Sequence, residues 1–217
     1  MAPFGFPVLL ELAGRRCVVI GELPIREGKV EALLAGGATD VLVVSTAPGD
    51  RLDDLELLEG VQVARRAWTS ADLTGAFLVI AHDVDPHERS RLSVAARGAG
   101  ALVNVVDDIP ACDWAMPAIV RRGELLLAIG TGGASPALAR KVRERLETEY
   151  GPEWAEVLRV LREVREETLP LLPDVRERSA RWREALDPDE AAALVQAGCA
   201  DELRGRLVTR LLDGARR

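Results

Sequence analysis

Two adjacent carboxylates, Asp107 and Asp108, close the apolar segment "ALVNVVDD" at residues 101–108. A carboxylate held at the end of a strand could take up or release a proton, which is the role of a general acid or base. Aspartates that follow strands also often cap the next turn through their side chains. Position alone favours the capping role, so the residues by themselves leave the chemistry of this pair open.

A second polar cluster lies in "AHDVDPHE" (residues 81–88), where His82, Asp83, Asp85 and His87 bring two imidazoles and two carboxylates into one loop. Such side chains could hold a divalent metal ion. Their spacing fits no established metal motif, and the other interpretation is a solvated loop with a helix N-cap. The sequence therefore assigns no metal site, and His82 and Asp85 are only candidate ligands.

The glycine-rich segment "IGTGGASP" (residues 129–136) leads into a helical pattern, with Ser135 as a possible N-cap and Pro136 at the first helical position. Glycines in such a turn let backbone amides face an anionic group at the start of a helix. The other interpretation is a tight turn before a capped helix, and the residues alone favour it.

The elements that position these residues alternate between short apolar runs and helical patterns, which predicts a parallel, doubly wound sheet. Strands are expected at residues 16–21, 40–45, 60–67, 76–81 and 101–108. In such sheets the ligand lies outside the carboxyl ends of the strands. The expected site is therefore one edge, lined by residues 21–25, 45–48, 82–86 and 107–110. From residue 113 the pattern changes to a hairpin over 114–130, a helix over 131–150 and a charged helical tail.

The composition limits the function classes. The 217 residues are 48% hydrophobic, which suffices for a substantial core, and the net charge of −7 argues against a nucleic-acid binder. Three widely spaced cysteines indicate neither a disulfide framework nor a cysteine zinc site. No segment reaches the ~20 apolar residues of a membrane span, and the N-terminus lacks the basic start of a signal peptide. A soluble cytoplasmic protein is expected.

Several stretches, in family order, resemble the precorrin-2 dehydrogenase/sirohydrochlorin ferrochelatase family, the N-terminal module of siroheme synthases. They read "FPVLLELAGRRCVVIG", "LVIAHDVD", "LVNVVDDIPACDWAMPAIVRRGELLLAIGTGGASPALARKVRERLE" and "ERSARWREAL". The resemblance implies a Rossmann-like dinucleotide-binding domain (1–112), a dimerisation region (113–150) and a small helical domain (151–217). It also implies NAD-dependent oxidation of precorrin-2 to sirohydrochlorin, with insertion of ferrous iron in some members.

The resemblance also implies roles for particular residues. The first aspartate of "NVVDD", Asp107, stands where the family has its key carboxylate, and with this motif the catalytic role becomes the favoured one. Asn104 and the turn residues Thr131, Gly132 and Gly133 are implied on the side of the carboxylate-rich tetrapyrrole.

The dinucleotide fingerprint departs from the family. Relatives usually read "VVGGGxVAxRK", whereas this chain reads "VVIGELPIREGK", so that Glu22 and Leu23 replace two glycines and Arg26 replaces a small alanine. A side chain at Leu23 opposes close approach of the backbone to a pyrophosphate, and Glu22 adds like charge beside it. Backbone contacts do not depend on side-chain identity. The residues expected to retain the cofactor are Gly21, Pro24, Ile25, Thr46 and Ala47.

Two functions follow from these observations. The first is NAD-dependent precorrin-2 oxidation, with or without insertion of ferrous iron. The second is a chelatase or tetrapyrrole-binding protein that has lost NAD binding, suggested by the altered fingerprint. In either case a homodimer is implied by the family, and a separate methyltransferase is expected to supply the tetrapyrrole.

Overall fold

The computed structural model describes residues 4–21, 28–46, 52–82 and 84–213. The chain forms two compact units, Met1–Met116 and Pro117–Arg217. Residues 113–116, which follow the last strand of the sheet, complete the first unit, and the further division of the second unit at residue 150 stays a prediction.

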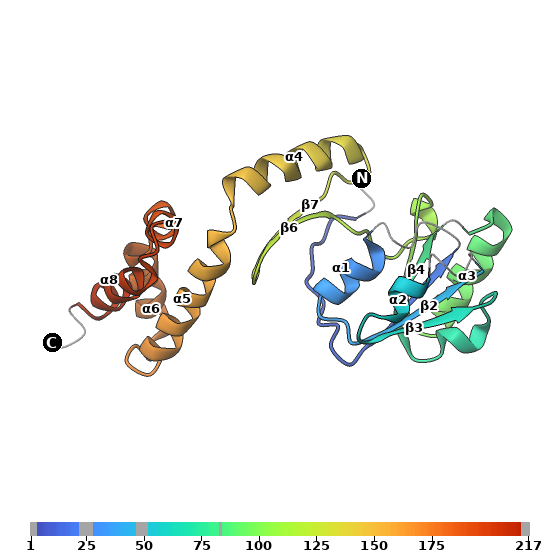
Figure 1. Cartoon of the computed structure of the whole chain (residues 1–217), viewed down its shortest axis with the longest axis horizontal. Helices are drawn as coiled ribbons and strands as arrows, with labels where there is room; N and C mark the ends of the chain where they lie inside the picture. The colour runs from blue at the N-terminus through green and yellow to red at the C-terminus, as the bar shows by residue number, and fades with distance from the viewer. Residues whose placement is uncertain (1–3, 22–27, 47–51, 83, 214–217) are drawn as a thin grey trace. The chain divides into compact units, whose positions relative to one another are not determined.

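The first unit is built on a five-stranded parallel sheet, which confirms the predicted α/β doubly wound class (Figure 1). Its strands are β1 (Arg16–Gly21), β2 (Asp40–Ser45), β3 (Val61–Arg65), β4 (Ala76–His82) and β5 (Leu102–Val105). Their order in the sheet is β3-β2-β1-β4-β5, and every neighbouring pair is parallel. The chain therefore adds β2 and β3 on one side of β1 and then returns to add β4 and β5 on its other side.

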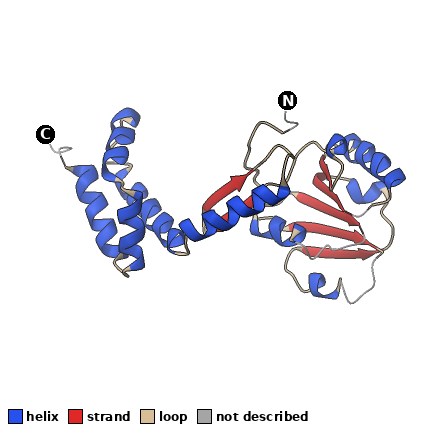
Figure 2. Ribbon diagram, turned by 90° about the horizontal axis from the view of Figure 1, so that it is seen from above, coloured by secondary structure: helices blue, strands red, loops and turns tan. Residues whose placement is uncertain are grey.

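Helices cover both faces of this sheet (Figure 2). They are α1 (Lys29–Ala35), α2 (Asp53–Glu56) and α3 (Pro86–Gly98), with the short 3₁₀ helices η2 (Ser70–Leu73) and η3 (Ile109–Ala111). Alternate residues of each strand enter two separate cores. In β1, Cys17 and Val19 pack in the core that contains Val30 of α1, whereas Val18 packs in the core that contains Leu92 of α3. Burial on both faces explains why the strands read as continuous apolar runs.

The second unit begins with an antiparallel hairpin of β6 (Ala118–Arg122) and β7 (Leu125–Ile129), as predicted. Its helices are α4 (Pro136–Glu149), α5 (Glu153–Thr168), α6 (Val175–Ala185), α7 (Pro188–Gln196) and α8 (Ala200–Leu212). Ser135 caps α4 as expected, because its hydroxyl accepts the N–H of Leu138 at 3.1 Å. The later helices share a core around Val157, Val160 and Val164. None of the helices that the structure describes has the length and apolarity needed to cross a membrane.

Candidate functional site

The strand order places a topological switch point between β1 and β4. Successive connections from β1 run first toward β3 and then toward β5, so the chains leaving β1 and β4 diverge at the carboxyl edge of the sheet. Ligands of open α/β sheets bind in the crevice that this divergence leaves. Gly21 and His82, which end β1 and β4, are register partners at this point. The structure therefore identifies this edge as the candidate site.

Gly21 is required at the switch point by the approach of β4. Its φ of 147° is a conformation that favours glycine, and a Cβ at this position would lie 1.6 Å from the carbonyl oxygen of His82. No side chain can be accommodated there without moving β4 away from β1. The first glycine of the altered fingerprint therefore has a structural cause in the described backbone, in addition to its predicted contact with a cofactor.

Asp107 occupies an unusual backbone conformation directly after β5. Its φ is 63°, and it is the one non-glycine residue with a positive φ among those the structure describes. The N–H of Asp108 donates to the carbonyl oxygen of Val105 at 3.1 Å, which closes a turn with Asp107 at its third position. Turns with a positive φ at that position usually hold glycine or asparagine there. Strained backbone of this kind clusters at functional sites, so the position itself points to a role for the carboxylate.

The capping role that position favours is not seen for either aspartate. Asp108 is the N-cap residue of η3, but its side chain accepts no capping hydrogen bond. Asp107 is exposed, and no side chain in the described ranges pairs with its carboxylate. An exposed carboxylate without a partner keeps both oxygens available to accept a proton or to bind a donor.

Asn104 lies on β5 just before this turn and is 9% exposed. Its amide donates to the carbonyl oxygen of Trp114 at 2.9 Å and approaches the Sγ atom of Cys112 at 3.7 Å. These contacts give Asn104 a structural task, which is to hold the segment that follows η3 against β5. Its predicted contact with substrate stays a prediction.

The sequence gives no sign of this role for Cys112, because an isolated cysteine has no recognisable spacing to a partner.

The histidine–aspartate loop is organised as a helix start. Oδ1 of Asp85 accepts the N–H of His87 at 2.8 Å, so Asp85 is the N-cap of α3, one of the alternatives that the sequence left open. His82 is half-buried, and its Nδ1 is buried without a hydrogen-bond partner in the structure. Asp83 lies outside the described residues. Within the described ranges, no three His, Cys, Asp or Glu side chains are grouped as metal ligands would be.

The predicted cofactor residues are only partly described. Pro24, Ile25 and Ala47, like Glu22, Leu23 and Arg26 of the altered fingerprint, lie outside the described residues. Gly21 is buried at the end of β1, and Thr46 is exposed just after β2. Both therefore lie at the carboxyl edge where a dinucleotide binds in this fold class. The glycine-only backbone at Gly21 and the buried, unpartnered Nδ1 of His82 fit a ligand at this edge.

Thr131, Gly132 and Gly133 belong to the second unit and form the turn between β7 and α4. The Thr131 hydroxyl donates to the carbonyl oxygen of Ser135 at 3.3 Å, and Oγ1 also lies 3.3 Å from the N–H of Ser135. Gly132 and Gly133 have φ values of 60° and 81°. The N–H of Ala134 donates to the carbonyl oxygen of Thr131 at 3.0 Å, so these residues form a tight turn before a capped helix, the interpretation that the residues alone favour. Binding of an anion by this turn stays a prediction.

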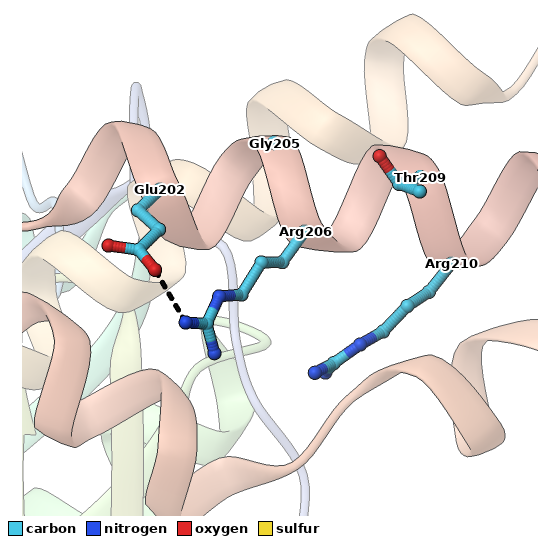
Figure 3. A pocket seen from close by; sticks show the side chains of 5 residues that line it. All are labelled: Glu202, Gly205, Arg206, Thr209 and Arg210. Carbon is cyan, nitrogen blue, oxygen red and sulfur yellow. Dashed lines mark hydrogen bonds and ion pairs between the residues drawn. The ribbon is translucent and has the colours of Figure 1, made fainter.

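A shallow hollow on α8 has a different character (Figure 3). It is lined by Glu202, Gly205, Arg206, Thr209 and Arg210. Both guanidinium groups are already paired, since Arg206 bonds Glu202 and Glu190, and Arg210 lies 2.6 Å from Glu190. The hydrogen bonds that Glu190 accepts from Arg210, as the largest influence, and from Arg206 lower its pKa to about 2. Charges on α7 and α8 that neutralise one another leave little to attract a ligand.

Two family models match the chain, one in each compact unit apart from the first two residues of the second unit. Residues 8–118 match the family model described as "Putative NAD(P)-binding", and residues 122–149 match the model "Sirohaem biosynthesis protein central". The first match contains the whole five-stranded sheet with its carboxyl edge. The second contains β7, the glycine turn and α4.

Similar curated proteins carry the name siroheme synthase. The protein of Methylococcus capsulatus is 32% identical over 97% of this chain, and that of Pseudomonas putida strain W619 is 33% identical over 96%. The chain spans 44% of the length of each of these relatives. Among solved structures, "SirC, precorrin-2 dehydrogenase" is similar in fold, with a TM-score of 0.59 and 23% identity over 98% of this chain and 99% of that one.

Proposed function

The chain belongs to the NAD(P)-binding family whose model spans its first unit, and from that premise we propose that it oxidises precorrin-2 to sirohydrochlorin with NAD. The observation that carries the proposal is the position of Asp107. Within the described ranges its carboxylate has no partner, and it is held in a glycine-like conformation at the carboxyl edge of the sheet, the edge where this fold class binds dinucleotides. The names of the siroheme synthase relatives and of the structurally similar dehydrogenase support the choice of substrate.

The chemistry requires two groups that act together. Oxidation of the macrocycle removes a hydride and a proton, and NAD, when bound, accepts the hydride. Asp107 is proposed to accept the proton, since its carboxylate is exposed and, within the described ranges, has no cation or donor that would hold it. The hydrogen-bonded turn from Val105 to Asp108 sets the backbone position from which that carboxylate is presented.

The remaining site residues take supporting roles in this proposal. Gly21 and Thr46, with Pro24, Ile25 and Ala47 beyond the described ranges, would hold the dinucleotide through backbone contacts. The N–H groups around Gly132 and Gly133, with Thr131, would bind carboxylates of the substrate. Asn104 would contact the substrate directly or, through its hydrogen bond to Trp114, hold the backbone that the substrate contacts.

A second candidate function is metal insertion, or tetrapyrrole binding, without oxidation. The observation that favours it is the fingerprint itself, where Glu22 and Leu23 oppose close approach of a pyrophosphate and Arg26 replaces the small residue that lets helix and strand pack closely. Insertion of ferrous iron also requires the pyrrole nitrogens to lose protons, so Asp107 would again accept them. His82 remains a candidate for contact with that metal, whereas Asp85 is occupied as a helix cap.

The proposal includes partners and a cellular setting. A methyltransferase would supply precorrin-2, and the cytoplasm is the proposed location. The active form would be a homodimer, since a two-stranded sheet such as β6–β7 is only marginally stable alone and retains two open edges.

Titration with NAD by calorimetry separates the two functions, with a Leu23→Gly variant measured in parallel. Binding by the unaltered chain supports the dehydrogenase. Binding that appears only in the variant means a decayed dinucleotide site and favours the second function.

The role of Asp107 is tested in the same preparation, by following formation of NADH and of sirohydrochlorin. Asp107→Asn should lower the rate by about a hundredfold or more, within the range for loss of a general base. Asp108→Asn is the matched control and should keep most of the activity. Equal losses in the two variants would contradict the assignment of the base.

A further inference from the structure

The strand that presents Asp107 lies at the edge of the sheet, so its outward backbone groups need partners from elsewhere. The N–H of Val106 points inward, where it donates to Ala81 of β4 at 2.9 Å. The N–H groups of Val103 and Val105 therefore point to the open side. Asp113 satisfies Val103 completely, because its Oδ2 accepts the N–H at 3.0 Å and its own N–H donates to the carbonyl oxygen at 2.7 Å.

At Val105 a thiol takes the place of the backbone partner. The Sγ atom of Cys112 accepts the N–H of Val105 and lies equally close, at 3.1 Å, to the carbonyl oxygen of the same residue. It also lies 3.3 Å from the carbonyl oxygen of Asp108. A thiol has one proton to donate, so it bonds one of these two carbonyls at a time while its sulfur continues to accept.

These contacts join the two ends of the turn that contains Asp107. Val105 begins the turn and Asp108 ends it, and the thiol contacts both. We propose that Cys112 is a positioning residue for Asp107, and that its hydrogen-bonded thiol holds the turn in the conformation that presents the carboxylate. The role rests on the proposed function, because it has a catalytic effect only if Asp107 is the base.

The surroundings of the thiol suit this role. Burial, as the largest influence, raises the pKa of Cys112, which keeps the proton on sulfur and the donor in place. The approach of Asn104 Nδ2 at 3.7 Å adds a polar contact on the β5 side. A serine would keep a donor and an acceptor on a shorter side chain. An alanine would leave the outward N–H of Val105 without its acceptor.

The test compares Cys112→Ala with Cys112→Ser, using Cys17→Ala as the control for removal of a buried thiol. Cys17 is fully buried in β1, and its thiol contacts the carbonyl oxygen of Arg15, so its loss should destabilise the fold without removing a hydrogen bond from the turn. For Cys112→Ala we expect kcat to fall about tenfold or more while KM for precorrin-2 and Kd for NAD change less than about threefold. The acidic limb of the pH–rate profile should also shift. Cys112→Ser should recover most of kcat, and Cys17→Ala should lower Tm with kcat retained.

Amide hydrogen exchange measures, independently of activity, how firmly the Cys112 thiol holds the turn. The amides of Val105 and Asp108 should exchange faster in Cys112→Ala, by about tenfold or more relative to their rates in Cys17→Ala. Unchanged exchange at both amides would overturn the proposal, as would an unchanged kcat and pH profile in Cys112→Ala, or a Cys112→Ser variant as impaired as the alanine variant. If the unaltered chain does not oxidise precorrin-2, or if Asp107→Asn is fully active, the proposed function fails. Exchange then still shows whether the thiol holds the turn.

Discussion

The carbonyl oxygen of His82 lies 1.6 Å from the point that a Cβ atom on Gly21 would occupy. These two residues end β1 and β4 and are register partners at the switch point of the sheet. The backbones of the two strands therefore lie too close together at this point for any side chain on Gly21. This contact also offers a way to separate a glycine needed for packing from one needed only for its conformation.

Gly21→Ala should lower the free energy of unfolding by about 3 kcal/mol, because it adds a clash with backbone to an unfavourable φ. Gly37→Ala is the control, since Gly37 has a φ of 88° but no heavy atom within 4 Å of the point that a Cβ atom would occupy. It should lose only about 1 kcal/mol, the cost of the conformation. Urea denaturation of both variants measures the difference. Similar losses would mean that β4 moves freely away from β1.

Asp107→Gly should separate stability from activity. Glycine adopts a φ of 63° without strain, so the variant should be as stable as the parent or more stable by up to about 1 kcal/mol. It has no carboxylate, so oxidation of precorrin-2 should be lost. Thermal unfolding and the NAD-linked assay check the two parts. A marked fall in stability would show that the carboxylate has a structural partner.

Much of the first unit could be predicted because its signals are local. The apolar runs at residues 16–21 and 40–45 are β-branched and buried on both faces, so composition alone indicates parallel strands. Ser135 and Asp85 cap helices through side chains that bond amides two or three residues away, and such spacing is visible in the sequence.

The details of the candidate site depend on contacts that have no sequence spacing. Cys112 reaches Val105 because η3 turns the chain back along the edge of β5, and an isolated cysteine does not show this. The positive φ of Asp107 is equally hidden, because the residue type that usually marks such a turn is absent. The sequence predicted only that the site lies at the carboxyl ends of the strands. The structure shows in addition that side chains along the outer edge of β5 support it.

The cap at Asp85 and a metal role for the same loop make different predictions. Asp85→Ala should lower the free energy of unfolding by about 1 kcal/mol, since it removes the acceptor for the N–H of His87. Asp85→Ser should restore most of that loss, although serine is a poor ligand for ferrous iron.

His82→Ala is compared with the unaltered chain in a chelation assay with ferrous iron and sirohydrochlorin. Unchanged chelation in His82→Ala would remove the loop from any metal pathway.

A buried carboxylate in η2, paired with an arginine, should make the first unit sensitive to acid. Asp72 is 5% exposed and accepts hydrogen bonds from Arg66 at 2.8 and 2.6 Å and from the N–H of Thr69 at 2.7 Å. The hydrogen bond from Arg66 is the largest influence, and it lowers the pKa of Asp72 from 3.8 to about 2. A depressed pKa in the folded state means that the stabilisation is fully present above pH 4 and is lost as the pH falls toward 2.

A shift of this size corresponds to a stabilisation of about 2 kcal/mol at neutral pH from the hydrogen bonds of Arg66 and Thr69 together. Asp72→Asn should therefore be less stable than the parent by about that amount at pH 7. The difference in free energy of unfolding between the parent and Asp72→Asn should disappear as the pH falls from about 4 to about 2. Asp53→Asn is the matched control, because Asp53 pairs with Arg65 at the surface with 64% of its side chain exposed, and it should change stability by less than about 1 kcal/mol. Denaturant unfolding between about pH 2 and pH 7 measures both variants. A gap for Asp72→Asn that stays constant over this range would show that the carboxylate acts through shape and not through its charge.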